Sequence, residues 1–164
     1  MEILDIVNQK DEVIGQAERK EVYAHKYLHR IVHVLIFNDQ GEMAMQLRSA
    51  HVAYCPRHWS TTVGGHVQVG EDYKTAALRE YQEELGIQTD IELFKKDFYQ
   101  GDGGISKFLT TYKTTFNGPF NPDPEVVEDV GFFSLDQIKE KIQNGEKFHP
   151  ELLFLLKKYF IPEV

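Results

Sequence analysis

The segment of residues 65–87 constrains this chain more than any other part of it. It contains glycines at its start and a regular pattern after them, which predicts a loop that leads into a helix ending at Gly86. At 100° per residue, three carboxylates of the last two turns fall within an arc of roughly 100°. They belong to Glu80, Glu83 and Glu84. A helix with this acidic face needs a physical explanation.

Local physics disfavours such a cluster. Like charges four residues apart destabilise an isolated helix by roughly 0.2–0.5 kcal/mol per pair, and the helix dipole favours cations at this end. A divalent cation reverses the argument, because Mg²⁺ takes several oxygen ligands and often bridges to a substrate phosphate. The segment therefore predicts a metal site. The alternative is a surface helix with a solvated acidic end, stabilised by an Arg79–Glu83 pair.

Composition limits the classes of partner. A chain of 164 residues suits one domain, and we expect that domain to span residues 1–164. The net charge of −8 argues against a nucleic-acid polymer as partner, whereas a polyphosphate can bind once a metal ion masks the charge. Cys55 is the only cysteine, so no disulfide framework is expected. No apolar run approaches the length of a membrane span and the N-terminus lacks a leader pattern, so we expect no membrane partner and a cytoplasmic setting.

The remaining chain predicts an α/β fold. An N-terminal hairpin is expected at about 1–20, followed by weak helical periodicity over 17–29. Strands are expected at 30–37, 43–48, 61–63, 90–94, 98–100, 107–116 and 125–133. Further helices are expected at 134–144, opened by a capping box, and at 150–160, opened by a proline. The glycine pair Gly64-Gly65 is expected to turn sharply and to approach a ligand closely.

Candidate substrate contacts come from the 49–60 loop and the strand before it. Alternation in that strand turns Gln46 and Arg48 away from the apolar face, toward a face where a site could lie. Arg48, Arg57 and Trp59 are candidate phosphate and base contacts, with packing or solvation as the alternative for each. The N-terminal hairpin could also pair across a two-fold axis, so a homodimer is left open.

The fixed residues of the 65–87 segment resemble a known pattern. The segment is similar to the Nudix box, without a gap or a missing position, although Tyr81 is bulkier than the aliphatic residue usual there. The matching positions are Gly65, Glu71, Arg79, Glu80, Glu83, Glu84, Gly86 and Ile87. The resemblance implies a Nudix-type α/β/α sandwich with a mixed sheet. It also implies a hydrolase of a small diphosphate substrate, a nucleoside diphosphate linked to another group, that uses Mg²⁺ or Mn²⁺.

The same resemblance implies roles for individual residues. Glu80, Glu83, Glu84 and the backbone carbonyl of Gly65 would hold the metal. Arg79 would orient the carboxylates, and Glu71 would brace the loop against the helix. The box does not fix which carboxylate takes the proton from water. Glu83 and Glu84 are candidates, with Glu125 and Glu128 as alternatives.

A second pattern extends over roughly residues 28–135 and consists of Leu28-His29, Leu35–Asn38, Arg48, Pro56, Trp59 and Val63–Glu71. It resembles the isopentenyl-diphosphate isomerase branch of this fold. That isomerase needs a cysteine where this chain has Gly64, and a glutamate pair where it has Ser106–Leu109. His29 and His66 match two of its metal histidines, which leaves open a partial second metal site or plain polar packing. The alternatives to hydrolysis are therefore isomerase-like activity and a non-catalytic nucleotide sensor.

Overall fold

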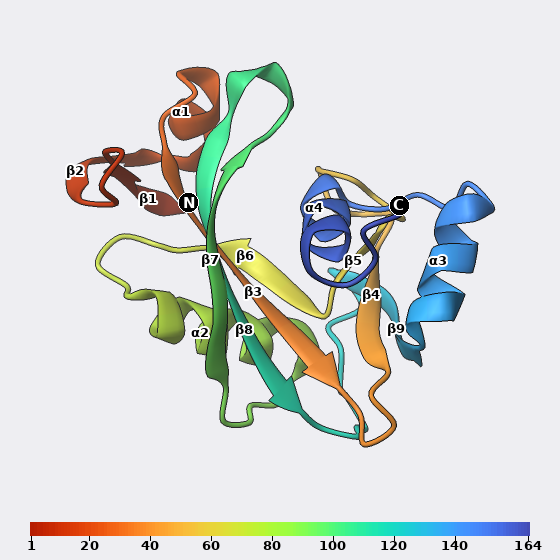
Figure 1. Ribbon diagram of the computed structural model, residues 1–164. Coiled ribbons are helices and arrows are strands. Elements are labelled where there is room, and N and C mark those ends of the chain that lie inside the picture. Colours follow the sequence, from red (N-terminus) through yellow and green to blue (C-terminus); the bar gives the residue numbers. More distant parts are fainter.

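The computed structural model describes residues 1–164 and contains a mixed sheet between helices (Figure 1). In chain order the elements are β1 (Ile3–Val7), β2 (Val13–Glu18), α1 (Arg19–Ala24), β3 (His29–Phe37), β4 (Met43–Arg48), β5 (Trp59–Thr61), β6 (Val63–His66), α2 (Tyr73–Leu85), β7 (Glu92–Gln100), a 3₁₀ turn η1 (Asp102–Gly104), β8 (Ser106–Thr115), β9 (Val127–Phe133), α3 (Leu135–Gln143) and α4 (Pro150–Tyr159).

Strand β3 is the centre of the sheet. It pairs in antiparallel fashion with β6 and in parallel with β8, and β8 pairs with β7. Its far end meets β4 at Phe37 and Met43, and β4 carries β5 and β9 as antiparallel neighbours. One parallel pair among antiparallel ones makes the sheet mixed, as expected.

Side chains of β3 alternate between two hydrophobic clusters. Val32, Val34 and Ile36 pack in the cluster that contains the inner face of α2, whereas Leu35 packs in the cluster that contains α3 and α4. Each fully buried side chain of this size contributes about 1.5–3 kcal/mol to folding. The expected α/β/α sandwich is therefore present, with β3 buried on both faces and the apolar side of α4 packed in the core.

The helix ends expected at Gly86, Ser134 and Pro150 are present, and the structure adds a cap at Asp72. Asp72 caps α2 by accepting a hydrogen bond from the amide of Thr75, and Gly86 ends that helix in the left-handed conformation at φ 71°. Ser134 and Gln137 form the reciprocal capping box of α3, and Pro150 opens α4. These boundaries depend on local side-chain chemistry, which is why the sequence reveals them.

The structure corrects four of the expected boundaries. Trp59 and Ser60 lie in strand β5 rather than in a loop, and the glycine pair lies within strand β6 rather than at a turn. The expected strands 90–94 and 98–100 form one strand, β7, with an irregularity between Leu93 and Lys95. The helix expected within 17–29 covers only 19–24. In each strand, pairing with a neighbour decides the boundary, and local propensity does not encode that pairing.

The N-terminal hairpin forms as predicted and packs against the rest of the chain. Strands β1 and β2 pair in antiparallel fashion, and Leu4 and Val7 are buried. In Figure 1 the hairpin and α1 lie on the side of the molecule where β7 turns into β8. None of the helices is both long and apolar enough to cross a bilayer.

Candidate active site

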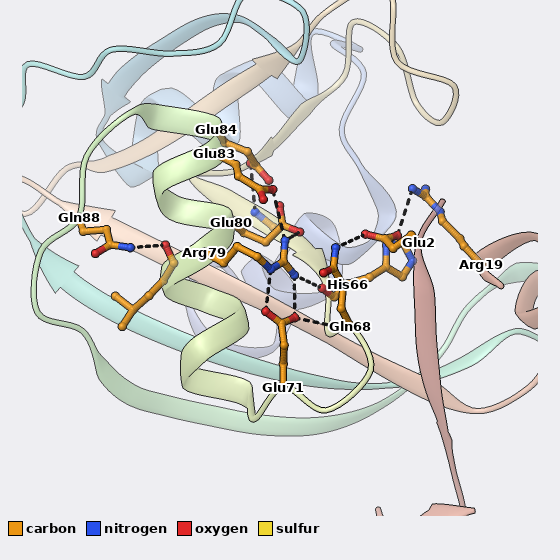
Figure 2. Close-up of polar contacts among 12 residues, drawn as sticks. Glu2, Arg19, His66, Gln68, Glu71, Arg79, Glu80, Glu83, Glu84 and Gln88 are labelled. Carbon is orange, nitrogen blue, oxygen red and sulfur yellow. Dashed lines mark hydrogen bonds and ion pairs between the residues drawn. The ribbon is translucent and has the colours of Figure 1, made fainter. Parts of the chain in front are cut away.

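Helix α2 turns two of its three clustered carboxylates inward. Glu80 and Glu84 are 8% and 6% exposed, whereas the side chain of Glu83 is 57% exposed. The spacing of four residues places the first two on the buried face of the helix. Figure 2 shows Glu80, Glu83 and Glu84 along one side of α2, above Arg79 and Glu71.

Arg79 holds the acidic side chains in a fixed arrangement. Its Nε and Nη2 donate to the two oxygens of Glu71 at 2.7 and 2.8 Å. Its Nη1 donates to Glu80 at 2.9 Å and to Glu83 at 3.2 Å, and Nη2 also reaches the carbonyl of His66 at 2.9 Å. Only a planar, five-donor guanidinium can make this set of contacts.

Glu71 joins the loop to the helix. It accepts a hydrogen bond from the amide of Gln68 at 2.8 Å and both bonds from Arg79. These donors keep the pKa of Glu71 below its usual value although burial acts in the opposite direction. This geometry matches the role that the resemblance implies for Glu71, which is to brace the loop against the helix.

Glycines of β6 allow the helix to approach the sheet. A Cβ atom at Gly65 would overlap the carboxyl group of Glu80, and one at Gly64 would lie 2.9 Å from Nδ1 of His33. Neither glycine has a positive φ. The close approach that we expected is therefore to the protein's own side chains, and glycine is required by lack of space rather than by a turn.

Glu84 is held from the sheet side. Gln46 donates to its Oε1 at 2.6 Å, and the amide of Gly64 lies 3.4 Å from the same oxygen. Gln46 comes from β4, on the face that alternation predicted. Burial raises the pKa of Glu84 well above its usual value, and the neighbouring carboxylate of Glu80 raises it further. Burial likewise raises the pKa of Glu80, against the effect of Arg79.

This donor set fits a hard divalent cation. Two adjacent, buried carboxylates repel each other unless a proton or a cation lies between them, and their oxygens are the ligands that Mg²⁺ and Mn²⁺ prefer. No three acidic, histidine or cysteine side chains are already gathered tightly enough to hold a metal ion, and Nη1 of Arg79 contacts both Glu80 and Glu83. Glu80, Glu83 and Glu84 are the side chains that could hold such a cation.

The inner face of α2 borders a cavity of about 1230 Å³. All three clustered glutamates line it, together with Gly64, Gly65 and Gln46. Its other walls come from the N-terminal segment, the 52–54 loop, the region around η1, and the start of α4. The carboxylates therefore face a space that can hold a small molecule, and not bulk solvent alone.

A buried polar network lies in the same cavity wall, and our sequence analysis did not assign it to the site. Glu151 of α4 accepts from Lys107 Nζ at 2.8 Å and lies 2.9 Å from Nε2 of His33. All three side chains line the cavity and are at most 6% exposed. The available signals were a histidine inside the apolar run of β3 and a lysine where the isomerase pattern has a glutamate.

The predicted substrate contacts are only partly retained. Arg48 lines the cavity, with its Nε on the carbonyl of Tyr54 at 3.0 Å. Trp59 instead packs in the α3–α4 cluster and donates to Glu146 at 3.1 Å. Arg57 pairs with Glu128 on the surface at 2.6 Å. Arg57 and Trp59 are absent from the cavity wall, which corrects our expectation. Strand β5 turns the indole of Trp59 into the core, and Glu128 pairs with Arg57 at the surface.

The alternative proton acceptors also lie away from the cavity. Glu125 and Glu128 are exposed, and neither lines the cavity, although their neighbour Val126 does.

The two histidines that match metal ligands of the isomerase, His29 and His66, stack with ring centroids 5.7 Å apart. His66 shares a hydrogen bond with Tyr23 at 2.7 Å, whereas Nε2 of His29 is buried without a partner. Burial lowers the pKa of His29 to about 4.

Comparison with known proteins supplies the decisive observation. The model of the NUDIX domain matches residues 27–156 of this chain. The chain belongs to the Nudix family. Nudix hydrolases generally need a divalent metal and act on small molecules, and this chain is a Nudix-type pyrophosphohydrolase.

Relatives are similar to this chain along nearly its whole length. A Nudix hydrolase of Streptomyces coelicolor is 34% identical over 147 residues, covering 88% of this chain and 81% of its own length. The Nudix hydrolase YfcD of Escherichia coli is 29% identical over 152 residues, covering 93% and 83%. A crystal structure from Deinococcus radiodurans has a TM-score of 0.86 at 26% identity, covering 97% and 99%. The Nudix domain of Shewanella oneidensis NrtR, solved with ADP-ribose, shares the fold at a TM-score of 0.62 and 17% identity, covering 87% and 96%.

Proposed function

We propose that this Nudix protein is a Mg²⁺- or Mn²⁺-dependent hydrolase of a nucleoside diphosphate linked to another group, or of a similar small pyrophosphate. The observation that carries the proposal is the pair Glu80 and Glu84, buried side by side against Gly64 and Gly65 at the wall of a large cavity. Two buried carboxylates in contact are costly without a cation, and a diphosphate is the natural partner of a cation held in this way.

Different residues of the chain position the carboxylates and accept the proton. Arg79 fixes Glu71, Glu80 and Glu83, and Gln46 fixes Glu84. A carboxylate of the cluster takes the proton of the attacking water while the bridging P–O bond breaks. Glu83 and Glu84 are both candidates for this role. When bound, the divalent ion supplies charge neutralisation for the diphosphate and makes water more acidic.

The test is Glu84→Gln in a metal and substrate screen. With Mg²⁺ or Mn²⁺ and a panel of nucleoside diphosphate derivatives, we expect turnover by the wild-type protein. Loss of an outer partner of a metal ligand costs about 10–100-fold, so loss of a proposed ligand should cost at least about 100-fold. The melting temperature should not fall, because the substitution removes a buried charge next to another one.

Glu128→Gln is the matched control, since this exposed glutamate lies outside the cavity; its turnover should equal that of the wild type. An undiminished rate for Glu84→Gln would overturn the assignment of Glu84. Tight nucleotide binding without hydrolysis under any divalent metal would favour the sensor alternative. Formation of the allylic isomer from isopentenyl diphosphate would favour the isomerase alternative, for which Gly64 supplies no thiol.

A further inference from the structure

A lysine is buried in the wall of the proposed catalytic cavity. Lys107, on β8, is 6% exposed and lines the same cavity as Glu80 and Glu84. Its ammonium group lies 2.8 Å from Glu151 and 5.3 Å from the centre of the Tyr23 ring. An ammonium has three donors, and Glu151 accepts one of them. Lys107 can therefore still donate to an anion in the cavity.

A short series of contacts joins this lysine to the proposed metal ligands. Glu151 bridges Lys107 and His33, and His33 is the cross-strand neighbour of Gly64. The amide of Gly64 in turn lies 3.4 Å from Glu84. The buried cation and the acidic pair thus belong to one packed unit, built where β3, β6, β8 and α4 meet.

Proton transfer is not a suitable role for this pair. Burial by itself would lower the pKa of Lys107, but the carboxylate of Glu151 raises it above its ordinary value. Burial by itself would raise the pKa of Glu151, but His33 and Lys107 lower it. A general acid or base works best with a pKa near the working pH. Both charges are instead permanent at neutral pH.

Fold stability alone does not explain the pair either. A buried ion pair often contributes no more to stability than apolar residues of the same volume, because both charges must lose their hydration. By contrast, a fixed cation has a direct use in a cavity that is also lined by the proposed metal ligands. Binding of a diphosphate requires positive charge for the phosphoryl group that the metal does not neutralise.

We propose that Lys107 binds the second phosphoryl group of the diphosphate substrate, and that Glu151 is a positioning residue that holds the ammonium in place. The inference rests on the proposed function and names a contact within the same site. His33 completes the arrangement by holding the other oxygen of Glu151.

The experiment measures binding of methylenediphosphonate, which cannot be hydrolysed at its P–C–P bridge, by calorimetry with Mg²⁺. Lys107→Met alone removes the buried cation beside Glu151 and leaves that carboxylate only its contact with His33, which endangers the fold. The decisive variant is therefore Lys107→Met with Glu151→Gln. We expect this double variant to fold and to bind at least about tenfold more weakly. In turnover assays its KM should rise while kcat changes little, a separation that a purely structural role would not produce.

Two further variants provide controls. Lys158→Met removes a lysine that also pairs with a buried carboxylate, that of Asp97 at 2.5 Å, but lies outside the cavity; its affinity should equal that of the wild type. Lys107→Arg keeps the charge and should retain most of the affinity. Glu151→Gln alone should raise KM less than the double variant does.

The possible failures are distinguishable. If the folded double variant binds methylenediphosphonate as tightly as the wild type, the role of Lys107 is overturned while the proposed function stands. If the wild-type protein itself binds no diphosphate with any divalent metal, the proposed function fails and this inference fails with it.

Discussion

At the scale of single residues, Arg79 fixes the positions of the acidic side chains around α2. It donates to three carboxylates, those of Glu71, Glu80 and Glu83, and so fixes their relative positions. Arginine is suited to this role because its donors form a rigid fork that matches carboxylate geometry. A lysine has a single nitrogen and cannot bind both oxygens of Glu71 while also reaching Glu80.

We therefore expect Arg79→Lys to reduce kcat/KM by at least about tenfold and to lower the free energy of unfolding by about 1–3 kcal/mol. Urea unfolding and steady-state kinetics test both values. Arg57→Lys is the control, because the Arg57–Glu128 pair is exposed and should change stability by less than about 0.5 kcal/mol. Full activity in Arg79→Lys would show that the fork is dispensable.

At the scale of elements, the site depends on how closely α2 approaches β6. The two elements touch where Gly65 faces Glu80, and there is no room for a methyl group between them. A side chain at this position would push the helix, and with it the proposed metal ligands, away from the sheet.

Gly65→Ala tests this contact. We expect it to destabilise the protein by about 1–3 kcal/mol, which is typical of overpacking in a tight site, and to reduce turnover. Gly15→Ala on β2 is the matched control, because its methyl group would make only an ordinary contact at 3.9 Å with Ile6. Circular dichroism melts and turnover rates give the comparison. Equal behaviour of the two variants would contradict the role of close packing.

At the scale of the whole molecule, buried histidines link folding to pH. Burial lowers the pKa of His29 and of His149 to about 4 and that of His66 well below its usual value. His29 and His149 are therefore neutral in the folded protein near pH 5 and take up protons when the chain unfolds. Their contribution to stability is therefore complete above about pH 6.5, the value of an unperturbed histidine, and is lost as the pH falls toward about 4.

Replacement of His29 by Gln should reduce this dependence. The wild-type free energy of unfolding should fall with decreasing pH between about 6.5 and 4, and each such histidine adds up to about 1.36 kcal/mol per pH unit to the slope. His29→Gln should remove one such contribution, whereas His51→Gln, at an exposed site, should leave the slope unchanged. Urea titrations at several pH values measure this slope of the free energy of unfolding against pH. An unaltered slope in His29→Gln would contradict the assignment.

Much of the fold could be predicted because its signals are local. The apolar run of β3, the cap Ser134, the left-handed Gly86 and the N-terminal hairpin all depend on residues close together in the chain. The extent of β7 and the start of β5 could not be predicted, because hydrogen bonds to strands far away in the sequence set those limits.

The sequence by itself determined the family and the acidic helix, because the residues that carry both lie within one 23-residue segment, 65–87, whose spacing can be read directly. Only the tertiary structure decided which carboxylates face the cavity and that Trp59 belongs to the core. It also brought Lys107 and Glu151 together across 44 residues. Burial and contact between distant elements determine those outcomes, and neither quantity is a property of a single stretch of chain.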